Sequence, residues 1–254
     1  MSKPAAPTTF DVEMLDFGLS GWYLGNALYP GFDVKPEDVV LDVGCGVGGF
    51  AAFCGRQGAH IIFCDIVEAN VAQTHALLKQ TSARELTPIV VSSEHLPLAD
   101  ETATRIICSD VLEHVADPQL MLAEAVRVAK PGAIFAISVP DPVSESLQKI
   151  VAPPLYFERP NHVRIFEVEA IADLVRQSGL VIERHDRIGC YFTLMLAFFW
   201  GCPGIDLATR DHPLLHAWAK TWWELMNMEG GTAFKEKLDS FLPSRQMIIA
   251  RKPA

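Results

Sequence analysis

The chain has 254 residues, which is enough for one complete α/β domain with an added element but not clearly for two domains. Half of its residues are hydrophobic and 20% are charged, so we expect a substantial core. The formal net charge is -10. Because binding to a nucleic-acid backbone depends on Lys and Arg neutralising phosphates, this charge disfavours a large RNA or DNA substrate.

The cysteine pattern and the apolar stretches bear on the compartment. The six cysteines are scattered without a C-x-x-C pair, which is typical of free thiols in a reducing environment. Residues 1–9 are rich in Pro, Ala and Thr, lack the apolar core of a signal peptide and are expected to be disordered. The longest apolar stretch, residues 188–201, is too short to span a bilayer. The sequence therefore predicts a cytoplasmic protein without stable membrane insertion.

The segment 39–48 reads Val-Val-Leu-Asp-Val-Gly-Cys-Gly-Val-Gly. Its apolar run predicts a buried strand, and its glycines predict a tight turn into a helix that continues through residues 50–53. The glycines also satisfy the G-x-G-x-x-G dinucleotide fingerprint, which is a weak signal alone. However, Asp42 places a carboxylate at the strand tip, which favours a cationic ligand group over a pyrophosphate.

A second strand, residues 60–65, ends in Asp65, about 20 residues after the first glycine, the spacing at which a carboxylate meets ribose hydroxyls. Further along, strands and helices alternate, which predicts a parallel sheet with helices on both faces. One helix has Asp117 as N-cap, followed by Pro118 at its first position. The later strands are predicted at 88–91, 104–108, 133–139, 180–188 and 245–251, and the later helices at 68–80, 119–129 and 168–178.

The long segment between the last two strands is the main departure from a bare fold of this type. Residues 191–200 are strongly apolar, and residues 213–228 carry three tryptophans among leucines and methionines. We expect this segment to form a helical lid. The predicted organisation is a cap segment at 1–36, a core at 37–189 plus 245–254, and the lid insertion at 190–244.

Two further motifs lie downstream, Ser-Glu-His-Leu-Pro-Leu-Ala-Asp at 93–100 and Ser-Asp-Val-Leu-Glu-His-Val-Ala-Asp-Pro at 109–118. With the glycine turn and its two acids, they resemble the class I S-adenosylmethionine (SAM) methyltransferases, in particular the large group with an L-E-H-V segment after the fourth strand. The resemblance covers residues 37–189 and the closing strand. It implies an α/β, Rossmann-like, doubly wound and mostly parallel seven-stranded sheet, here with the lid inserted before the last strand.

The resemblance implies SAM as the cofactor and S-adenosylhomocysteine as its product. The first strand and its turn would hold the methionine part, Asp65 the ribose and Ile66 the adenine. The family usually has an acid-Ala pair where this chain has Ser92 and Ser93, so the backbone of Ser93 is expected to contact the adenine. The residues expected at the cofactor are Asp42, Gly44, Cys45, Gly46, Asp65, Ile66, Ser93, Glu94 and Ser109.

Methyl transfer needs an aligned nucleophile more than a fixed catalytic residue, so the sequence is a poor guide to the acceptor. His162, in the loop before the helix at 168–178, is the candidate catalytic residue, because a neutral imidazole can deprotonate a hydroxyl. The alternative is that His162 caps that helix. His114 is interpreted as a helix residue tied to the fold, with the alternative that it faces the acceptor.

Asp110, Glu113 and His114 place two carboxylates and an imidazole in one short segment, and His162 could add a fourth ligand. This resembles the E-x-x-E-H arrangement of metal-dependent 2′-O-methyltransferases of small RNAs and the metal site of some ubiquinone-pathway O-methyltransferases. A Mg²⁺ or similar ion there would hold acceptor oxygens and lower a hydroxyl pKa. Many methyltransferases carry L-E-H-V without a metal, so a site without metal is the alternative.

The apolar lid favours a hydrophobic or aromatic small-molecule acceptor, and we expect an O-methyltransferase. C- or N-methylation of a natural product, saccharide or lipid is the nearest alternative. The lid residues could instead form a homodimer face, and a rival interpretation is a catalytically inactive SAM-binding partner that dimerises through it. A NAD-dependent oxidoreductase is a third possibility, which Asp42 and the L-E-H-V segment disfavour.

Overall fold

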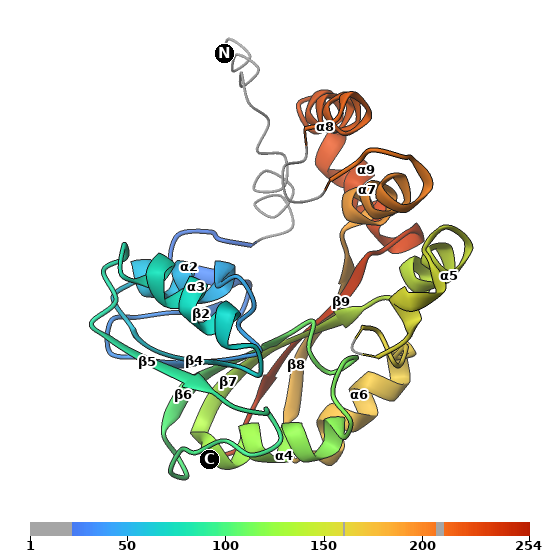
Figure 1. Cartoon of the computed structure of the whole chain (residues 1–254). Coiled ribbons are helices and arrows are strands. Elements are labelled where there is room, and N and C mark those ends of the chain that lie inside the picture. Colours follow the sequence, from blue (N-terminus) through green and yellow to red (C-terminus); the bar gives the residue numbers. More distant parts are fainter. Residues whose placement is uncertain (1–21, 160, 207–210) are drawn as a thin grey trace.

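The computed structural model describes residues 22–159, 161–206 and 211–254, and its architecture is drawn in Figure 1. The expectation of disorder at residues 1–9 and most of the predicted cap segment lie outside the described residues. A seven-stranded sheet forms the centre of the molecule, in the order β5-β4-β3-β6-β7-β9-β8. The predicted doubly wound sheet is therefore confirmed.

All neighbouring strands are parallel except β9, which runs antiparallel to β7 and β8. Chain order reverses between β3 and β6, and ligands of such sheets bind at the carboxyl ends of the strands beside this point. The strands are β3 (Val39–Val43), β4 (His60–Asp65), β5 (Glu85–Val90), β6 (Ala103–Ser109), β7 (Ala129–Pro140), β8 (Val181–Ile188) and β9 (Arg245–Arg251).

Two hydrophobic clusters cover the two faces of the sheet, because successive strand residues point to opposite sides. Helices α2 (Gly49–Arg56) and α3 (Glu68–Leu78) pack on one face, around Val40 and Phe63. Helices α4 (Pro118–Val128) and α6 (Val168–Gln177) pack on the other, around Leu41 and Phe135 (Figure 1).

The described part of the N-terminal segment packs on the same face as α2. Its strands β1 (Ala27–Tyr29) and β2 (Phe32–Asp33) form a small antiparallel pair. Trp22 is 1% exposed and stacks on Phe50 of α2, with ring centroids 5.1 Å apart. These contacts anchor the segment immediately before the glycine turn. Its predicted role as a cap over the cofactor stays a prediction.

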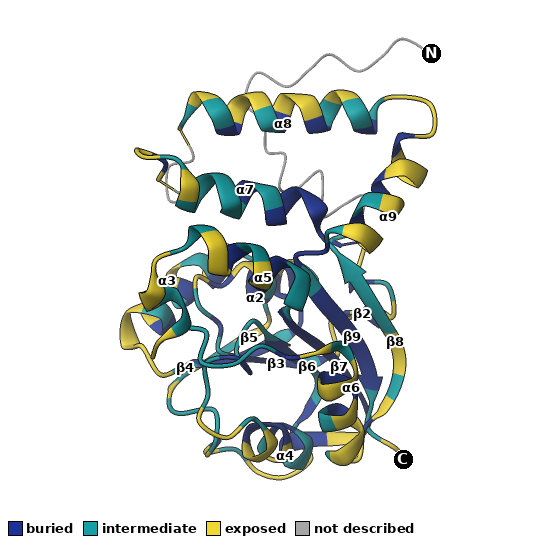
Figure 2. Ribbon diagram, turned by 90° about the vertical axis from the view of Figure 1, so that its right-hand side faces the viewer, coloured by how far each residue is buried: buried dark blue, intermediate teal, exposed yellow. Residues whose placement is uncertain are grey.

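The described residues of the insertion between β8 and β9 form three helices, α7 (Cys190–Gly201), α8 (Pro213–Met226) and α9 (Gly231–Phe241). They share their own hydrophobic cluster, in which Tyr191 stacks on Trp218. Helix α7 lies between α8 and α5 (Pro142–Val151), as Figure 2 shows. The insertion starts and ends side by side, because the amide of Ser244 donates to the carbonyl of Ile188 at 2.8 Å.

Among the described residues, helix α5, the 3-10 turn η1 (Pro154–Phe157) and the strands β1 and β2 have no predicted counterpart, and α9 was predicted only as an undivided part of the helical lid. By contrast, the predicted cap of α4 is confirmed, since the Asp117 carboxylate accepts from the amides of Gln119 and Leu120, both at 3.0 Å. His114 was predicted on a helix, and this was wrong: it lies in a turn between β6 and α4. In the part of the chain that the structure describes, no helix is both long and apolar enough to cross a membrane.

Candidate active site

The turn that joins β3 to α2 lies at the carboxyl end of the sheet, beside the point where strand order reverses. The amides of Gly44 and Cys45 both donate to the carbonyl of Cys64, at 2.8 and 2.9 Å, which ties this turn to the end of β4. Gly44 and Gly46 have φ angles of 71° and 51°, the left-handed region that glycine adopts without strain. The backbone can therefore curve closely around the space above the strands.

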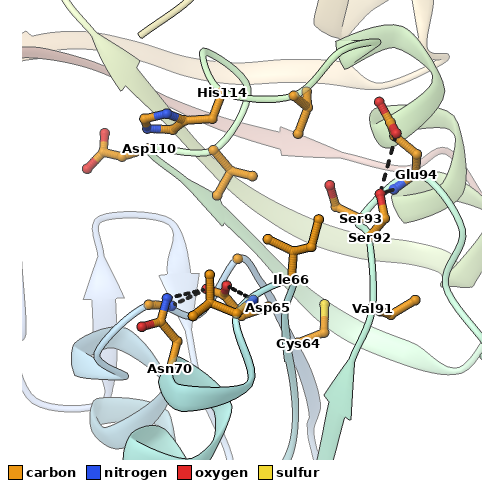
Figure 3. Close-up of a pocket in the computed structure, with 15 residues that line it drawn as sticks. Cys64, Asp65, Ile66, Asn70, Val91, Ser92, Ser93, Glu94, Asp110 and His114 are labelled. Atoms are coloured by element: carbon orange, nitrogen blue, oxygen red, sulfur yellow. Dashed lines mark hydrogen bonds between the residues drawn. The ribbon is translucent and has the colours of Figure 1, made fainter. Parts of the chain in front are cut away.

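A cavity of about 480 Å³ opens above this turn (Figure 3). In Figure 3, His114 and Asp110 lie at one end of the cavity, while Ser93 and Glu94 lie along another side. The lining residues are Gly44, Gly46, Cys64, Asp65, Ile66, Val67, Asn70, Val91, Ser92, Ser93, Glu94, Asp110, Val111, His114 and Val115. Its walls come from the ends of β3, β4, β5 and β6, as expected for a ligand site in this fold.

The carboxylate of Asp65 is held in one orientation by three donors. Its Oδ2 atom accepts from the amide of Gly46 at 3.0 Å and the side chain of Asn70 at 3.1 Å. Its Oδ1 atom accepts from the amide of Val67 at 2.8 Å. A carboxylate has about four lone-pair positions. Asp65 therefore retains capacity to accept a further donor, such as a hydroxyl, from a molecule in the cavity.

Asp42 does not line the cavity. Its residue is only 3% exposed, and burial raises the pKa of its carboxyl to about 7, while a hydrogen bond from the Ala51 amide opposes this shift. The charge of Asp65 raises the pKa further. A cationic group bound nearby would favour the ionised form of Asp42. Because Asp42 is buried, such a group would act on it without direct contact, unless the side chain became more exposed.

Glu94 lines the cavity, but its carboxylate already has a structural role. Its Oε1 atom accepts from the amide of Asp117 at 2.9 Å, next to the start of α4, and the Ser92 hydroxyl donates to its other oxygen at 3.4 Å. Ser93 presents no side-chain hydrogen bond among those described. These positions are compatible with the predicted use of the Ser93 backbone.

Six of the nine residues predicted at the cofactor therefore line one cavity, and three do not. The six are Gly44, Gly46, Asp65, Ile66, Ser93 and Glu94. Asp42 is buried at the end of β3, and Cys45, 7% exposed, belongs to the turn. Ser109 is not among the lining residues; its hydroxyl lies 2.7 Å from that of Ser138, which in turn donates to the lining residue Asp110 at 3.3 Å. Of the missed lining residues, Asn70 carried a recognisable signal, a polar side chain in the helix that follows an acid-ended strand.

At one end of the cavity, Glu113, His114 and His162 come together. One potential ligand atom from each lies within 4.8 Å of the others, and the two imidazole centroids are 5.0 Å apart. Glu113 is 1% exposed, and among the described residues neither of its carboxyl oxygens has a hydrogen-bond partner. Burial, reinforced by the charge of Asp110, raises the pKa of Glu113 well above its usual range.

Arg164 fixes the loop that carries His162 against the turn that carries His114. Its Nη1 atom donates to the carbonyl of Leu112 at 3.1 Å and to that of Val115 at 2.5 Å, and its Nη2 atom donates to Ala116 at 3.1 Å. The amide of Val163 also donates to the carbonyl of Glu113 at 3.1 Å. His162 does not cap the following helix, since its ring is paired with Glu145 at 3.1 Å.

The predicted four-residue metal set is brought together only in part. Asp110 lies outside the cluster, because its φ of 53° turns it toward Ser138 and toward Arg245, 3.5 Å away. The remaining carboxylate and two imidazoles fit a divalent ion, since a cation would compensate the buried Glu113 carboxyl, which lies 3.8 Å from Nε2 of His114 and accepts no hydrogen bond from the described residues. A set with two nitrogens suits Zn²⁺ or Fe²⁺ better than the Mg²⁺ of our expectation.

Comparison with known proteins agrees with this architecture. The methyltransferase-domain family matches residues 41–137. A ubiquinone biosynthesis O-methyltransferase of Ruegeria pomeroyi is 30% identical over 179 residues, covering 67% of this chain and 70% of that protein. Its counterpart in Acinetobacter baylyi is 29% identical over 194 residues, covering 69% and 76%. The chain belongs to the class I SAM-dependent methyltransferases.

Solved structures show the same fold at low sequence identity. A putative methyltransferase of Bacillus halodurans matches with a TM-score of 0.57 at 15% identity, covering 96% of this chain and 99% of that one. A putative sarcosine dimethylglycine methyltransferase of Galdieria sulphuraria gives 0.58 at 20%, covering 86% and 80%. The cyclase SpnF also gives 0.58 at 19%, covering 96% and 82%. These likenesses establish the fold and leave the acceptor open.

Proposed function

We propose that this enzyme transfers a methyl group from SAM to a hydroxyl oxygen of a hydrophobic or aromatic small molecule. The observation that carries the proposal is that His114, which lines one end of the cavity above the glycine turn, is clustered with Glu113 and His162 directly behind the lining. The names of the relatives, ubiquinone biosynthesis O-methyltransferases, support the choice of oxygen. The net charge of -10 argues against a nucleic-acid acceptor.

In this proposal the cavity holds SAM along the strand ends. The remaining acceptor capacity of Asp65 takes the ribose hydroxyls, and Ile66, 73% exposed within the lining, packs against the adenine. Asp42 compensates the ammonium of the methionine part from beneath the turn. The backbone around Gly44, Cys45 and Gly46 and the carbonyl of Ser109 complete that end.

The chemistry is an in-line displacement at the sulfonium methyl. A bond forms from the acceptor oxygen to the methyl carbon, the carbon–sulfur bond breaks, and S-adenosylhomocysteine leaves with the electron pair. His162 takes the hydroxyl proton, and the neighbouring His114 helps to orient the acceptor. General-base catalysis of this kind contributes roughly 10²–10⁴-fold, and alignment of the reactants supplies much of the rest.

A metal-assisted form of the same reaction is the second candidate, favoured by the buried carboxyl of Glu113, which accepts no hydrogen bond from the described residues. Glu113, His114 and His162 would hold the ion, which would lower the pKa of an acceptor hydroxyl. In that case the same residues would position the acceptor oxygen through the ion rather than take its proton directly.

The insertion of α7, α8 and α9 supplies the acceptor side. Tyr156 and Trp200 pack edge to face, with centroids 5.4 Å apart, and thereby join the His162 region to α7. An aromatic surface there suits an apolar acceptor. As a separate proposal, the same insertion offers a face for a homodimer. Location in the cytoplasm stays a prediction.

The first test is calorimetric titration of SAM, S-adenosylhomocysteine and NADH into the purified protein, followed by an acceptor screen with labelled SAM. We expect binding of the first two ligands and label transfer to a phenolic or other hydroxyl compound. Binding of SAM with transfer only to carbon or nitrogen would replace the oxygen assignment. Binding without turnover on any acceptor would favour the inactive-partner alternative.

A further inference from the structure

Helix α5 carries a buried carboxylate outside the cavity lining. Glu145 is 1% exposed, and both of its oxygens are engaged. The hydroxyl of Tyr156 donates to Oε1 at 3.1 Å, and Nδ1 of His162 lies 3.1 Å from Oε2. Asp141 caps the start of this helix, accepting from the amide of Val143 at 2.9 Å, and thereby fixes where Glu145 points from its first turn.

The partners of Glu145 determine which nitrogen of His162 carries a hydrogen. The Tyr156 hydroxyl donates to one oxygen of Glu145, which therefore acts as an acceptor on that side. A carboxylate accepts on both oxygens, and therefore His162 donates from Nδ1. The second nitrogen, Nε2, then keeps its lone pair.

Several contacts hold His162 in this orientation. Its backbone amide donates to the carbonyl of Tyr156 at 3.1 Å, and the tyrosine ring packs on the imidazole with centroids 4.4 Å apart. On another side, the ring of His114 packs edge to face with that of His162. The imidazole is therefore enclosed by a carboxylate, a phenol ring and a second imidazole from three different segments.

We propose that Glu145 is a positioning residue that fixes His162 as its Nδ1–H tautomer, so that the Nε2 lone pair is available to the acceptor hydroxyl. The link to an acceptor rests on the proposed function, whereas the tautomer does not. The same tautomer would serve a metal ion, since carboxylates behind ligating histidines fix ring orientation in this way.

The direct test is NMR of the full chain labelled with ¹⁵N-histidine, in mildly alkaline buffer where the imidazoles are neutral. The His162 signals are assigned by their loss in His162→Gln. We expect Nδ1–H in the wild type and a shift toward Nε2–H in Glu145→Leu. Ile150→Ala, an exposed change on the same helix, is the matched control and should leave the signals in place.

Activity provides the second measurement. Glu145→Leu should lower kcat about 10–100-fold, the usual cost of losing such a partner, while the SAM affinity stays within about twofold. Glu145→Gln keeps an acceptor oxygen for Nδ1–H and should recover most of this loss. Equal losses in both variants, or a loss confined to SAM binding, would contradict a positioning role.

The two proposals fail in different ways. An Nε2–H tautomer in wild-type protein that methylates a hydroxyl overturns the role of Glu145 alone. An Nδ1–H tautomer that depends on Glu145, in protein that methylates only carbon or nitrogen, overturns the O-methyltransferase assignment and leaves the positioning of His162 supported. The wild-type spectrum decides the tautomer even if Glu145→Leu does not fold.

Discussion

A Cβ atom on Gly44 would lie only 2.4 Å from Cγ2 of Val111, so the glycine turn and the turn after β6 touch at this point. The two segments come from neighbouring strands, β3 and β6, on either side of the reversal in strand order. The width of the cavity between them therefore depends on the absence of a side chain at position 44.

Gly44→Ala is expected to displace Val111 and to weaken SAM binding at least tenfold, since it adds both a clash and left-handed strain of about 1–2 kcal/mol. Calorimetry and thermal unfolding measure the two effects. Gly179→Ala is the matched control, because its φ is also positive, its Cβ would meet nothing within 4 Å, and it does not line the cavity. Val111→Ala should partly restore the SAM affinity and thermal stability that Gly44→Ala loses. If Gly44→Ala caused equal losses with Val111 and with Ala at position 111, the contact would be contradicted.

Asp65→Asn is expected to weaken SAM binding about 10–100-fold, because hydrogen bonds to a charged group contribute about 1.5–3 kcal/mol. The substitution also replaces one carboxylate oxygen, which accepts a hydrogen bond, with an amide NH2 group, which can only donate. The control is Glu68→Gln, an exposed acid on the following helix. Unchanged affinity in Asp65→Asn would remove Asp65 from the cofactor site.

Asp42 predicts a specific pH dependence of stability. Its pKa is about 7 when folded, against about 3.9 when unfolded, so the folded chain binds more protons between these values. The free energy of unfolding should therefore fall as the pH rises from about 4 to about 7, and this contribution should be constant above. Glu113, whose pKa is also raised, acts with the same sign.

Asp42→Asn should flatten this slope. At about pH 8 the variant without ligand should be more stable than the wild type, by about 1.4 kcal/mol for each unit by which folding raises the pKa of Asp42. Urea unfolding at about pH 5 and about pH 8 measures it. Asp33→Asn, an exposed change, should leave the slope unaltered. A slope that persists in Asp42→Asn would assign the pH dependence to another group.

Arg164→Ala is expected to lower kcat about tenfold or more while the SAM affinity changes little. The guanidinium joins the His162 loop to three carbonyls of the neighbouring turn, and its loss leaves these carbonyls without their donor. Arg164→Lys should restore only part of the activity, since an ammonium lacks the planar fork. Arg176→Ala, an exposed change on α6, is the control. A similar loss of kcat in this control would contradict a specific role of the Arg164 contacts.

If a metal takes part, chelator should abolish activity, and added Zn²⁺, Fe²⁺ or Mn²⁺ should restore it. Calorimetry with each ion should show binding that His162→Ala and Glu113→Gln remove. Asp110→Ala should retain binding, because Asp110 lies outside the cluster. Activity that is unchanged in chelator would leave His162 as the base without a metal. Loss of binding in Asp110→Ala would restore the four-residue set.

The cofactor half of the site was predictable from the sequence because its residues follow strand ends in chain order. A glycine turn after β3 and an acid at the end of β4 must meet at one edge of a parallel sheet. The sheet order and the hydrogen bond from the Gly46 amide to Asp65 confirm that these two segments meet. Which of these residues contact SAM stays a prediction.

The acceptor half was less predictable because its contacts cross between segments without a shared pattern. Glu145 lies on a helix that the sequence did not indicate, and nothing in its spacing links it to His162. Asp110 seemed equivalent to Glu113 in the motif, yet its left-handed backbone turns it elsewhere. Backbone conformations of this kind depend on tertiary contacts, which residue spacing does not encode.

The adjacent ends of the insertion have an evolutionary consequence. Ile188 pairs with Arg245 across β8 and β9, so the chain leaves and rejoins the sheet at one place. The Asp239 carboxylate accepts from the amides of Gly189 and Cys190 at 3.1 and 2.8 Å. These hydrogen bonds hold α9 against the start of the insertion. The whole segment between these points can lengthen, shorten or be exchanged while every strand keeps its register. This arrangement lets the helical segment change in length and sequence without altering the sheet edge that carries Gly44 and Asp65.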